Sequence, residues 1–170
     1  AIGARVGQRA SLLLLSKGLV APMAALPSEY VSERVRARAI ASLGGPAHAK
    51  EAVSGTAALV LGSRDPDLRD QLGSVFDEAG LVCERSDDMI GVEVAGAAKN
   101  AAALAGAAAH AQGMNAAGIA TAQVWRECVA YALARGAEHE TFAGIAGVGD
   151  LTATILAEGW RCAISIAPCP

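Results

Sequence analysis

The sequence predicts an α/β unit of the doubly wound kind, followed by an all-α part. Two short, continuous apolar runs, residues 11–16 (SLLLLS) and 56–62 (TAALVLG), are typical of strands buried on both faces of a parallel sheet. A helix signal and a third short strand follow the second run, which gives a strand–helix–strand unit. Beyond Asp87 and Asp88 the residues are mostly good helix formers broken only by single glycines, which indicates helices.

Composition and charge limit the possible partners. The chain is 53% hydrophobic and 18% charged, with mean hydropathy +0.35, so it has enough apolar residues to bury a core and we expect a globular fold. A net charge of −3 gives no general attraction to nucleic acid or to an anionic membrane, and we expect neither partner. Polar residues interrupt the most apolar third, and the start lacks a signal-peptide pattern, so we expect a cytoplasmic protein without a membrane span.

Metal binding and a disulfide framework are not expected. The four cysteines form no C-x-x-C pair, and their setting suits reduced thiols: Cys83, Cys128, Cys162 and Cys169. The three histidines share no metal-ligand spacing: His48, His110 and His139.

The first half contains further signals for the starts and ends of helices and strands. Residues 27–41 are a polar stretch that fits either a short helix or a covering loop. Pro46 is placed to open a short helix over residues 47–53. Asp65 and Pro66 predict a helix cap and first position, Gly80 a helix end, and residues 81–84 the third strand. No G-x-G-x-x-G follows a strand here, so the half lacks an obvious dinucleotide cradle.

The second half predicts four helices. The first runs from Met89 to about residue 111, and Gly113 breaks it. Asn115 can cap the next helix, to residue 134, and Gly136 closes it. Two shorter helices are expected at 138–143 and 150–157. The boundary near residues 86–90 has no flexible linker, so the two parts should pack together.

Two lysines are candidates for chemistry. Lys17 follows an apolar strand, at the carboxyl edge where open α/β sheets place ligands, although a strand must also simply end in something polar. Lys99 lies in an almost uncharged helical segment, where a buried ammonium is costly unless it is paired or its pKa is lowered. Such a lysine could exchange a proton with a reacting oxygen. The alternative is a lysine that reaches solvent from the polar side of the helix.

Two further charged residues can each be explained by a structural or by a functional role. Asp150 precedes LTAT and fits a helix cap, but an aspartate beside a catalytic lysine would also hold its charge and orientation. Arg161 could clamp a phosphate with its fork of donors or be an ordinary surface arginine.

Four segments, in order and with near-family spacing, resemble the NAD(P)-dependent glycerol-3-phosphate dehydrogenase family over about residues 11–161. They are SKGL at 16–19, GGPAHAKE at 44–51, DDMIGVEVAGAAKN at 87–100 and ETFAGIAGVGDLTAT at 140–154. The resemblance implies hydride transfer between NAD or NADP and C2 of dihydroxyacetone phosphate or sn-glycerol 3-phosphate, in phospholipid precursor synthesis or glycerol-3-phosphate catabolism. It leaves a homodimer possible and does not separate NAD from NADP.

The resemblance also implies domains and residue roles. Residues 1–87 would be the C-terminal part of a Rossmann domain, and 88–170 a truncated helical substrate domain. Lys99 would be the acid/base at the C2 oxygen. The residues expected to bind substrate are Lys17, Gly45, Asn100, Asp150, Thr154 and Arg161. Those expected to face the cofactor are Lys17, Ala49 and Arg161.

The sequence departs from the family pattern at several positions, and these departures bear on substrate binding and activity. Ala47 replaces a serine or threonine whose hydroxyl helps to bind substrate, and Cys162 replaces an asparagine before an unusual tail, AISIAPCP. The tail suggests a frameshift or a truncated product, and we expect weak or absent activity from the chain itself. The alternatives are a non-catalytic fragment or assembly module and a related lysine-dependent hydroxy-acid dehydrogenase.

Overall fold

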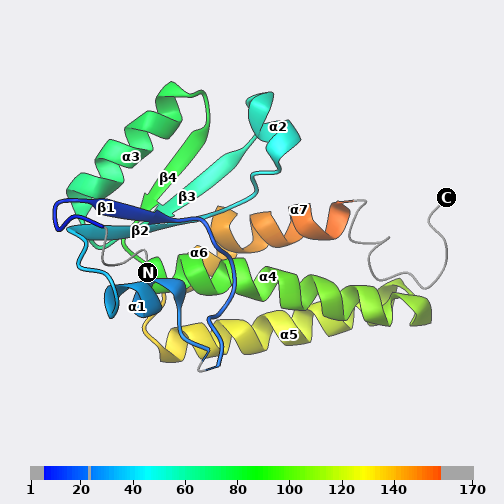
Figure 1. Ribbon diagram of the computed structural model, residues 1–170. Helices are drawn as coiled ribbons and strands as arrows, with labels where there is room; N and C mark the ends of the chain where they lie inside the picture. The colour runs from blue at the N-terminus through cyan, green and yellow to red at the C-terminus, as the bar shows by residue number, and fades with distance from the viewer. Residues whose placement is uncertain (1–5, 23, 158–170) are drawn as a thin grey trace.

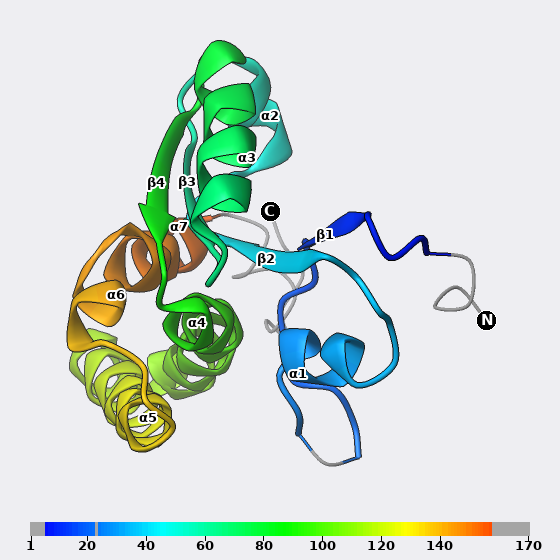
Figure 2. The ribbon, with the colours of Figure 1, turned by 90° about the vertical axis from the view of Figure 1, so that its left-hand side faces the viewer.

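A computed structural model describes residues 6–22 and 24–157. It contains a four-stranded sheet in the order β1-β2-β3-β4, with α3 on one face and α4 and α5 on the other (Figures 1 and 2). The strands are β1 (Ser11–Leu14), β2 (Ala39–Gly44), β3 (Ala58–Gly62) and β4 (Val82–Ser86). β1 runs parallel to β2 and β3 parallel to β4, but β2 and β3 are antiparallel, pairing Ser42 with Gly62. The sheet is therefore mixed.

The central strand β2 and its antiparallel pairing correct the sequence analysis. The polar stretch divides into helix α1 (Pro27–Ser32), a loop and the start of β2, whose short AIASLG sequence carries little strand signal. The connection from β2 to β3 holds only the small helix α2 (Ala49–Val53), which begins after His48 rather than at Pro46. This connection, residues 45–57, is shorter than the connections within the two parallel pairs, β1–β2 and β3–β4.

Helix α3 (Pro66–Glu78) covers one face of the sheet, as its cap signals predict. Asp65 Oδ1 accepts a hydrogen bond from Leu68 N at 2.7 Å, and the chain turns at Gly80 with φ of +80°. The buried cluster between α3 and the sheet consists of Ala41, Leu59, Leu61, Leu68 and Cys83.

Helix α4 (Met89–Ala109) lies between the other face of the sheet and α5 (Met114–Ala134) (Figure 2). A short 3-10 turn, η2 (His110–Gln112), joins the two helices. Asn115 lies inside α5, and the cap position is Gly113 without a side-chain hydrogen bond, so the predicted asparagine cap was wrong. The buried cluster on this side consists of Leu26, Val60, Val92, Val94, Ala95, Ala132, Phe142 and Ala146.

Three short elements complete the described chain: α6 (His139–Ala143), the π-helical turn η3 (Ile145–Gly149) and α7 (Asp150–Leu156). They run beside α4, and α7 packs on its C-terminal half through Ala102, Ala103 and Leu151 (Figure 1). Within the described residues, no helix combines the length and apolarity that a membrane crossing requires.

Candidate active site

Three charged side chains from distant parts of the chain meet where the sheet adjoins α4. Lys99 Nζ lies 2.5 Å from Asp150 Oδ1, and Lys17 Nζ lies 2.7 Å from Asp150 Oδ2. Asp150 is 0% exposed and Lys99 is 7% exposed, whereas the Lys17 side chain retains 29% exposure. One buried carboxylate therefore sits between two ammonium groups, one buried and one open to solvent.

Local structure explains how each charge reaches this point. Lys17 follows β1 at the carboxyl end of the strand, and its Nζ also donates to the carbonyl oxygen of Gly45, after β2, at 3.2 Å. Because β1 and β2 are parallel, their carboxyl ends meet at one edge. Asp150 is the first residue of α7, and its side chain pairs with the lysines instead of capping the helix, so the capping interpretation was wrong.

Burial lowers the pKa of Lys99. Removal from water lowers the pKa of Lys99 most, and the neighbouring Lys17 charge lowers it further, while the hydrogen bond to Asp150 partly offsets this. A lysine whose pKa is lowered toward neutrality gives up and recovers a proton more readily than an ordinary one.

Gly45 is required by the backbone at this edge. Its φ is +93°, and a Cβ atom there would lie 2.7 Å from the carbonyl oxygen of Ala58. Thr154 is buried on α7 and donates its hydroxyl to the carbonyl oxygen of Asp150 at 2.7 Å, which fixes the first turn below the carboxylate.

The remaining predicted residues are less closely gathered. Asn100 follows Lys99 on α4 and is half-buried, and Ala49 begins α2 on the exposed surface. Arg161 lies outside the described residues, as do Cys162 and the tail. The structure thus brings together Lys17, Gly45, Lys99, Asp150 and Thr154.

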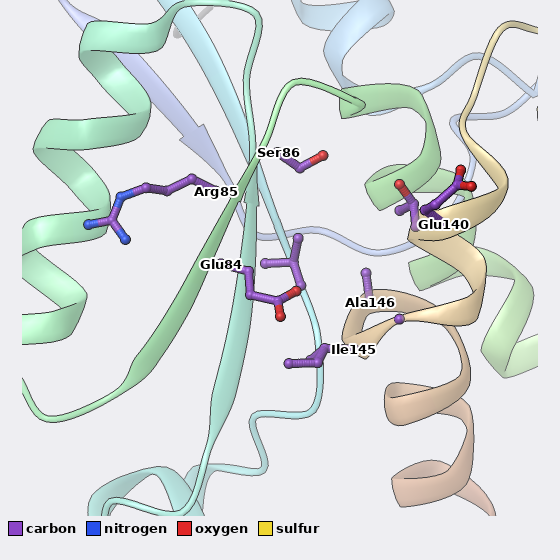
Figure 3. Close-up of a pocket in the computed structure, with 9 residues that line it drawn as sticks. Glu84, Arg85, Ser86, Glu140, Ile145 and Ala146 are labelled. Carbon is purple, nitrogen blue, oxygen red and sulfur yellow. The ribbon is translucent and has the colours of Figure 1, made fainter.

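A hollow of about 300 Å³ opens beside Lys17, lined mainly by the loop after β1 and by α1, including Leu14, Leu19 and Tyr30. A second hollow of about 150 Å³ lies between β4 and η3 (Figure 3). None of the predicted site residues lines the second one. Arg85, although it borders this hollow, turns toward α3 and pairs with Asp77 at 2.7 Å.

Two buried acids on α4 and before it were missed by the sequence analysis. Asp88 accepts from Gly91 N, Glu138 N and Thr141 Oγ1, and so joins the starts of α4 and α6. Glu93 is 5% exposed and accepts from Ser28. The reasoning applied to Lys99, that a charge within an apolar helical segment needs a partner, would have found Glu93.

The described residues hold neither a cluster of three potential metal ligands nor a disulfide between Cys83 and Cys128, which are both free thiols. Cys169 and Cys162 fall in the part of the chain that the structure does not describe.

The small mixed sheet joined to a mostly helical part matches solved dehydrogenase structures that have a Rossmann-like part and a helical C-terminal domain. Residues 88–167 match the family model of the NAD-dependent glycerol-3-phosphate dehydrogenase C-terminus. The match extends across the segment that contains Arg161. By this match and by the relatives below, the chain is similar to NAD(P)-dependent glycerol-3-phosphate dehydrogenases over most of its length.

Individual relatives and solved structures that match the chain carry the same name, glycerol-3-phosphate dehydrogenase. The chain is 38% identical over 147 residues to a glycerol-3-phosphate dehydrogenase [NAD(P)+] of Mesorhizobium japonicum, covering 84% of this chain and 43% of the relative. The crystal structure of glycerol-3-phosphate dehydrogenase from Coxiella burnetii superposes with a TM-score of 0.79 at 26% identity, covering 89% of this chain and 47% of that one. The Plasmodium falciparum enzyme, at 20% identity and a TM-score of 0.80, shares the fold. The chain spans less than half the length of these relatives.

Proposed function

We propose that this chain supplies the acid/base and substrate-binding half of an enzyme that interconverts sn-glycerol 3-phosphate and dihydroxyacetone phosphate with NAD or NADP. The observation that carries the proposal is the buried contact of Lys99 with Asp150, with Lys17 on the other carboxylate oxygen. It places a buried lysine that could exchange a proton beside a second, partly exposed lysine.

Lys99 is the proposed acid/base. Its Nζ would give a proton to the C2 oxygen as the ketone is reduced and take one from the C2 hydroxyl as the alcohol is oxidised. Asp150 favours the protonated form and fixes the direction of the amine, since its Oδ1 accepts from Nζ. Burial works in the opposite sense by lowering the pKa of Lys99.

Substrate binding is assigned to the residues around this pair. Lys17 is partly exposed and would contact an oxygen of the substrate, and Gly45, Asn100 and Thr154 would line the same cleft. The triad of one carboxylate and two ammonium groups has a formal charge of about +1, which favours an anionic, phosphorylated substrate. Arg161 is proposed to hold the phosphate group.

The residues present fit the reacting end of a nicotinamide cofactor. Lys17 lies at the carboxyl edge of β1, and its Nζ donates to the carbonyl oxygen of Gly45 at the carboxyl edge of β2. Lys17, Ala49 and Arg161 would face the cofactor, which supplies or accepts the hydride when bound. The described residues contain no G-x-G-x-x-G turn after a strand, so none of them is assigned to the pyrophosphate of the cofactor.

We also propose a domain organisation, a cellular location and an oligomeric state for the protein. Residues 1–87 would form the C-terminal part of the Rossmann domain and 88–170 part of the helical substrate domain. We further propose a cytoplasmic enzyme, able to form a homodimer, that supplies phospholipid precursors or consumes glycerol 3-phosphate.

Ligand-induced thermal stabilisation of the purified chain tests the proposal. Dihydroxyacetone phosphate and glycerol 3-phosphate, each with and without NADH or NADPH, should raise Tm by several degrees, because a ligand that binds only the native state stabilises it. A hydroxy acid without phosphate serves as the ligand control. Lys99→Met should abolish the shift, whereas Arg126→Met, which removes an equal charge from the exposed face of α5, should keep it. Equal shifts in both variants would contradict the proposed site.

A further inference from the structure

Glu93 is a buried carboxylate that takes no part in the proposed proton transfer. It lies on α4, about one and a half turns before Lys99, and is 5% exposed. Ser28 binds both of its oxygens: Ser28 N donates to Oε1 at 3.0 Å and Ser28 Oγ donates to Oε2 at 2.6 Å. The bidentate contact crosses from the helical layer to α1.

The contact holds the end of a segment that starts at the site. Residues 17–28 run from Lys17 to the second residue of α1, and the N-cap position of that helix is Leu26, which has no side-chain acceptor. Glu93 therefore supplies from another helix the acceptor that the first turn of α1 lacks. Leu26, at 0% exposure, is packed into the core next to this contact.

Helix α4 meets the same segment at two further levels. The aliphatic stem of Lys17 lies over Gly96, where an added Cβ would be 3.4 Å from Lys17 Cγ. Lys99 reaches the tip of Lys17 through Asp150. Helix α4 thus contacts the end of the segment and the stem of Lys17, and it shares Asp150 with the ammonium group of Lys17.

A buried carboxylate is an expensive way to attach a helix if attachment is its only role. Taking the charge out of water costs free energy that an apolar side chain of similar volume would avoid. What the carboxylate adds is direction, because two charge-assisted hydrogen bonds fix the position of Ser28 in a way that apolar contact does not.

We propose that Glu93 is a positioning residue for Lys17: by clamping Ser28, it holds this segment, described over residues 17–22 and 24–28, against α4 and keeps Lys17 Nζ between Asp150 and Gly45. The functional meaning of this position rests on the proposed function, but the closure of the segment is a property of the chain that needs no ligand to observe.

The test is residue-resolved acetylation of lysines in the full purified chain, read by mass spectrometry. The sequence has three lysines, Lys17, Lys50 and Lys99, and exposed Lys50 is an internal reference for the reagent. Glu93→Leu should raise the labelling rate of Lys17 relative to Lys50 about tenfold, because opening the segment no longer breaks hydrogen bonds to a charged group. Glu93→Gln should restore near-normal labelling, since its amide oxygen can accept from Ser28 N while its NH2 donates to Ser28 Oγ.

Two further variants keep the test decisive. Leu72→Ala weakens the core between α3 and the sheet without touching the segment, so it should lower Tm and leave the ratio of Lys17 to Lys50 labelling unchanged. Ser28→Ala removes one of the two clamp bonds and should give a smaller rise in the same direction, which serves if Glu93→Leu does not fold. The proposal is overturned if Leu72→Ala raises the ratio as much as the clamp variants, or if neither clamp variant raises it.

The ligand experiment separates this inference from the proposed function. If ligand does not shift the Tm of the wild-type chain, but Glu93→Leu raises Lys17 labelling, the positioning role is supported and the proposed activity is contradicted. A chain that binds ligand with Lys17 labelling independent of Glu93 overturns the positioning role alone.

Discussion

Asp150 is the residue on which the candidate site depends. Two buried or partly buried ammonium groups share its carboxylate, so Asp150 is the counter-charge for both of them. Burying such a group is seldom the most stable solution for a core, and replacing an ion pair by apolar side chains is often neutral or stabilising. The cluster therefore makes better sense as chemistry than as a source of stability.

Removing the carboxylate should cost more than removing either ammonium group. Asp150→Asn leaves Lys17 and Lys99 facing each other without a counter-charge, and we expect a loss of about 3 kcal/mol in the free energy of unfolding. Lys99→Met should cost less, because Asp150 keeps Lys17 as a partner. Urea unfolding at pH 7 measures both, and the double variant should recover part of the loss. A larger loss in Lys99→Met than in Asp150→Asn would contradict this account.

Glu93 gives a prediction on pH. Burial is the main cause that raises the pKa of Glu93 in the folded chain, and hydrogen bonds from Ser28 only partly offset it. A carboxyl whose folded pKa is raised contributes full stability below its unfolded pKa, and that contribution is lost as pH rises through the folded pKa. The Tm of wild type minus that of Glu93→Gln should therefore fall as pH rises from about 4 toward neutrality. A difference that is flat with pH, or that grows, would show that the folded pKa is not raised.

At the scale of elements, local signals predicted what local chemistry controls. The Asp65–Pro66 start and Gly80 end of α3 agree with the structure, as does the long helix from Met89, because caps and breakers act within a turn. β2 was missed because its small, weakly apolar residues gain strand character only from neighbours on both sides. The meeting of Lys17, Lys99 and Asp150 could be suspected from family resemblance, but their contact depends on tertiary packing.

The π-helical turn η3 was also beyond local prediction, and it tests how tightly the backbone is arranged before Asp150. A Cβ added at Gly147 would lie 2.1 Å from the carbonyl oxygen of Phe142, which is backbone and cannot rotate away. Gly147→Ala should therefore destabilise the chain by about 2 kcal/mol or more and weaken ligand binding. The matched control is Gly118→Ala in exposed α5, where an added Cβ meets nothing within 4 Å. It should stabilise by about 0.5 to 1 kcal/mol, as alanine replaces glycine inside a helix. Denaturant unfolding of the pair decides, and equal signs would contradict the clash.

At the scale of the molecule, α4 belongs to both parts of the fold. Its first turns pack on the sheet through Val92, which lies against Gly44 of β2 and Gly62 of β3, while its other face meets α5 and α6 around Ala132 and Phe142. The proposed boundary at residues 87 and 88 thus falls just before the helix whose side chains complete the core of both parts. A site built from Lys17 on one side and Asp150 on the other can keep its geometry only if these parts do not move independently.

This shared core predicts that the sheet and α4 unfold together. Native-state hydrogen exchange should give amides of β3 and of the first half of α4 the same free energy of opening, within about 0.5 kcal/mol, since neither keeps its buried face without the other. Val92→Ala, at the contact between them, should lower both values equally, by about 1 to 2 kcal/mol. Amides in the middle of α5, which packs on α4 but has Ala132 as its one buried residue, should open at lower free energy and respond less. If β3 instead exchanged well before α4, and Val92→Ala affected only one of them, the two parts would be separate folding units. The Lys17–Asp150–Lys99 cluster would then have to form anew each time they docked.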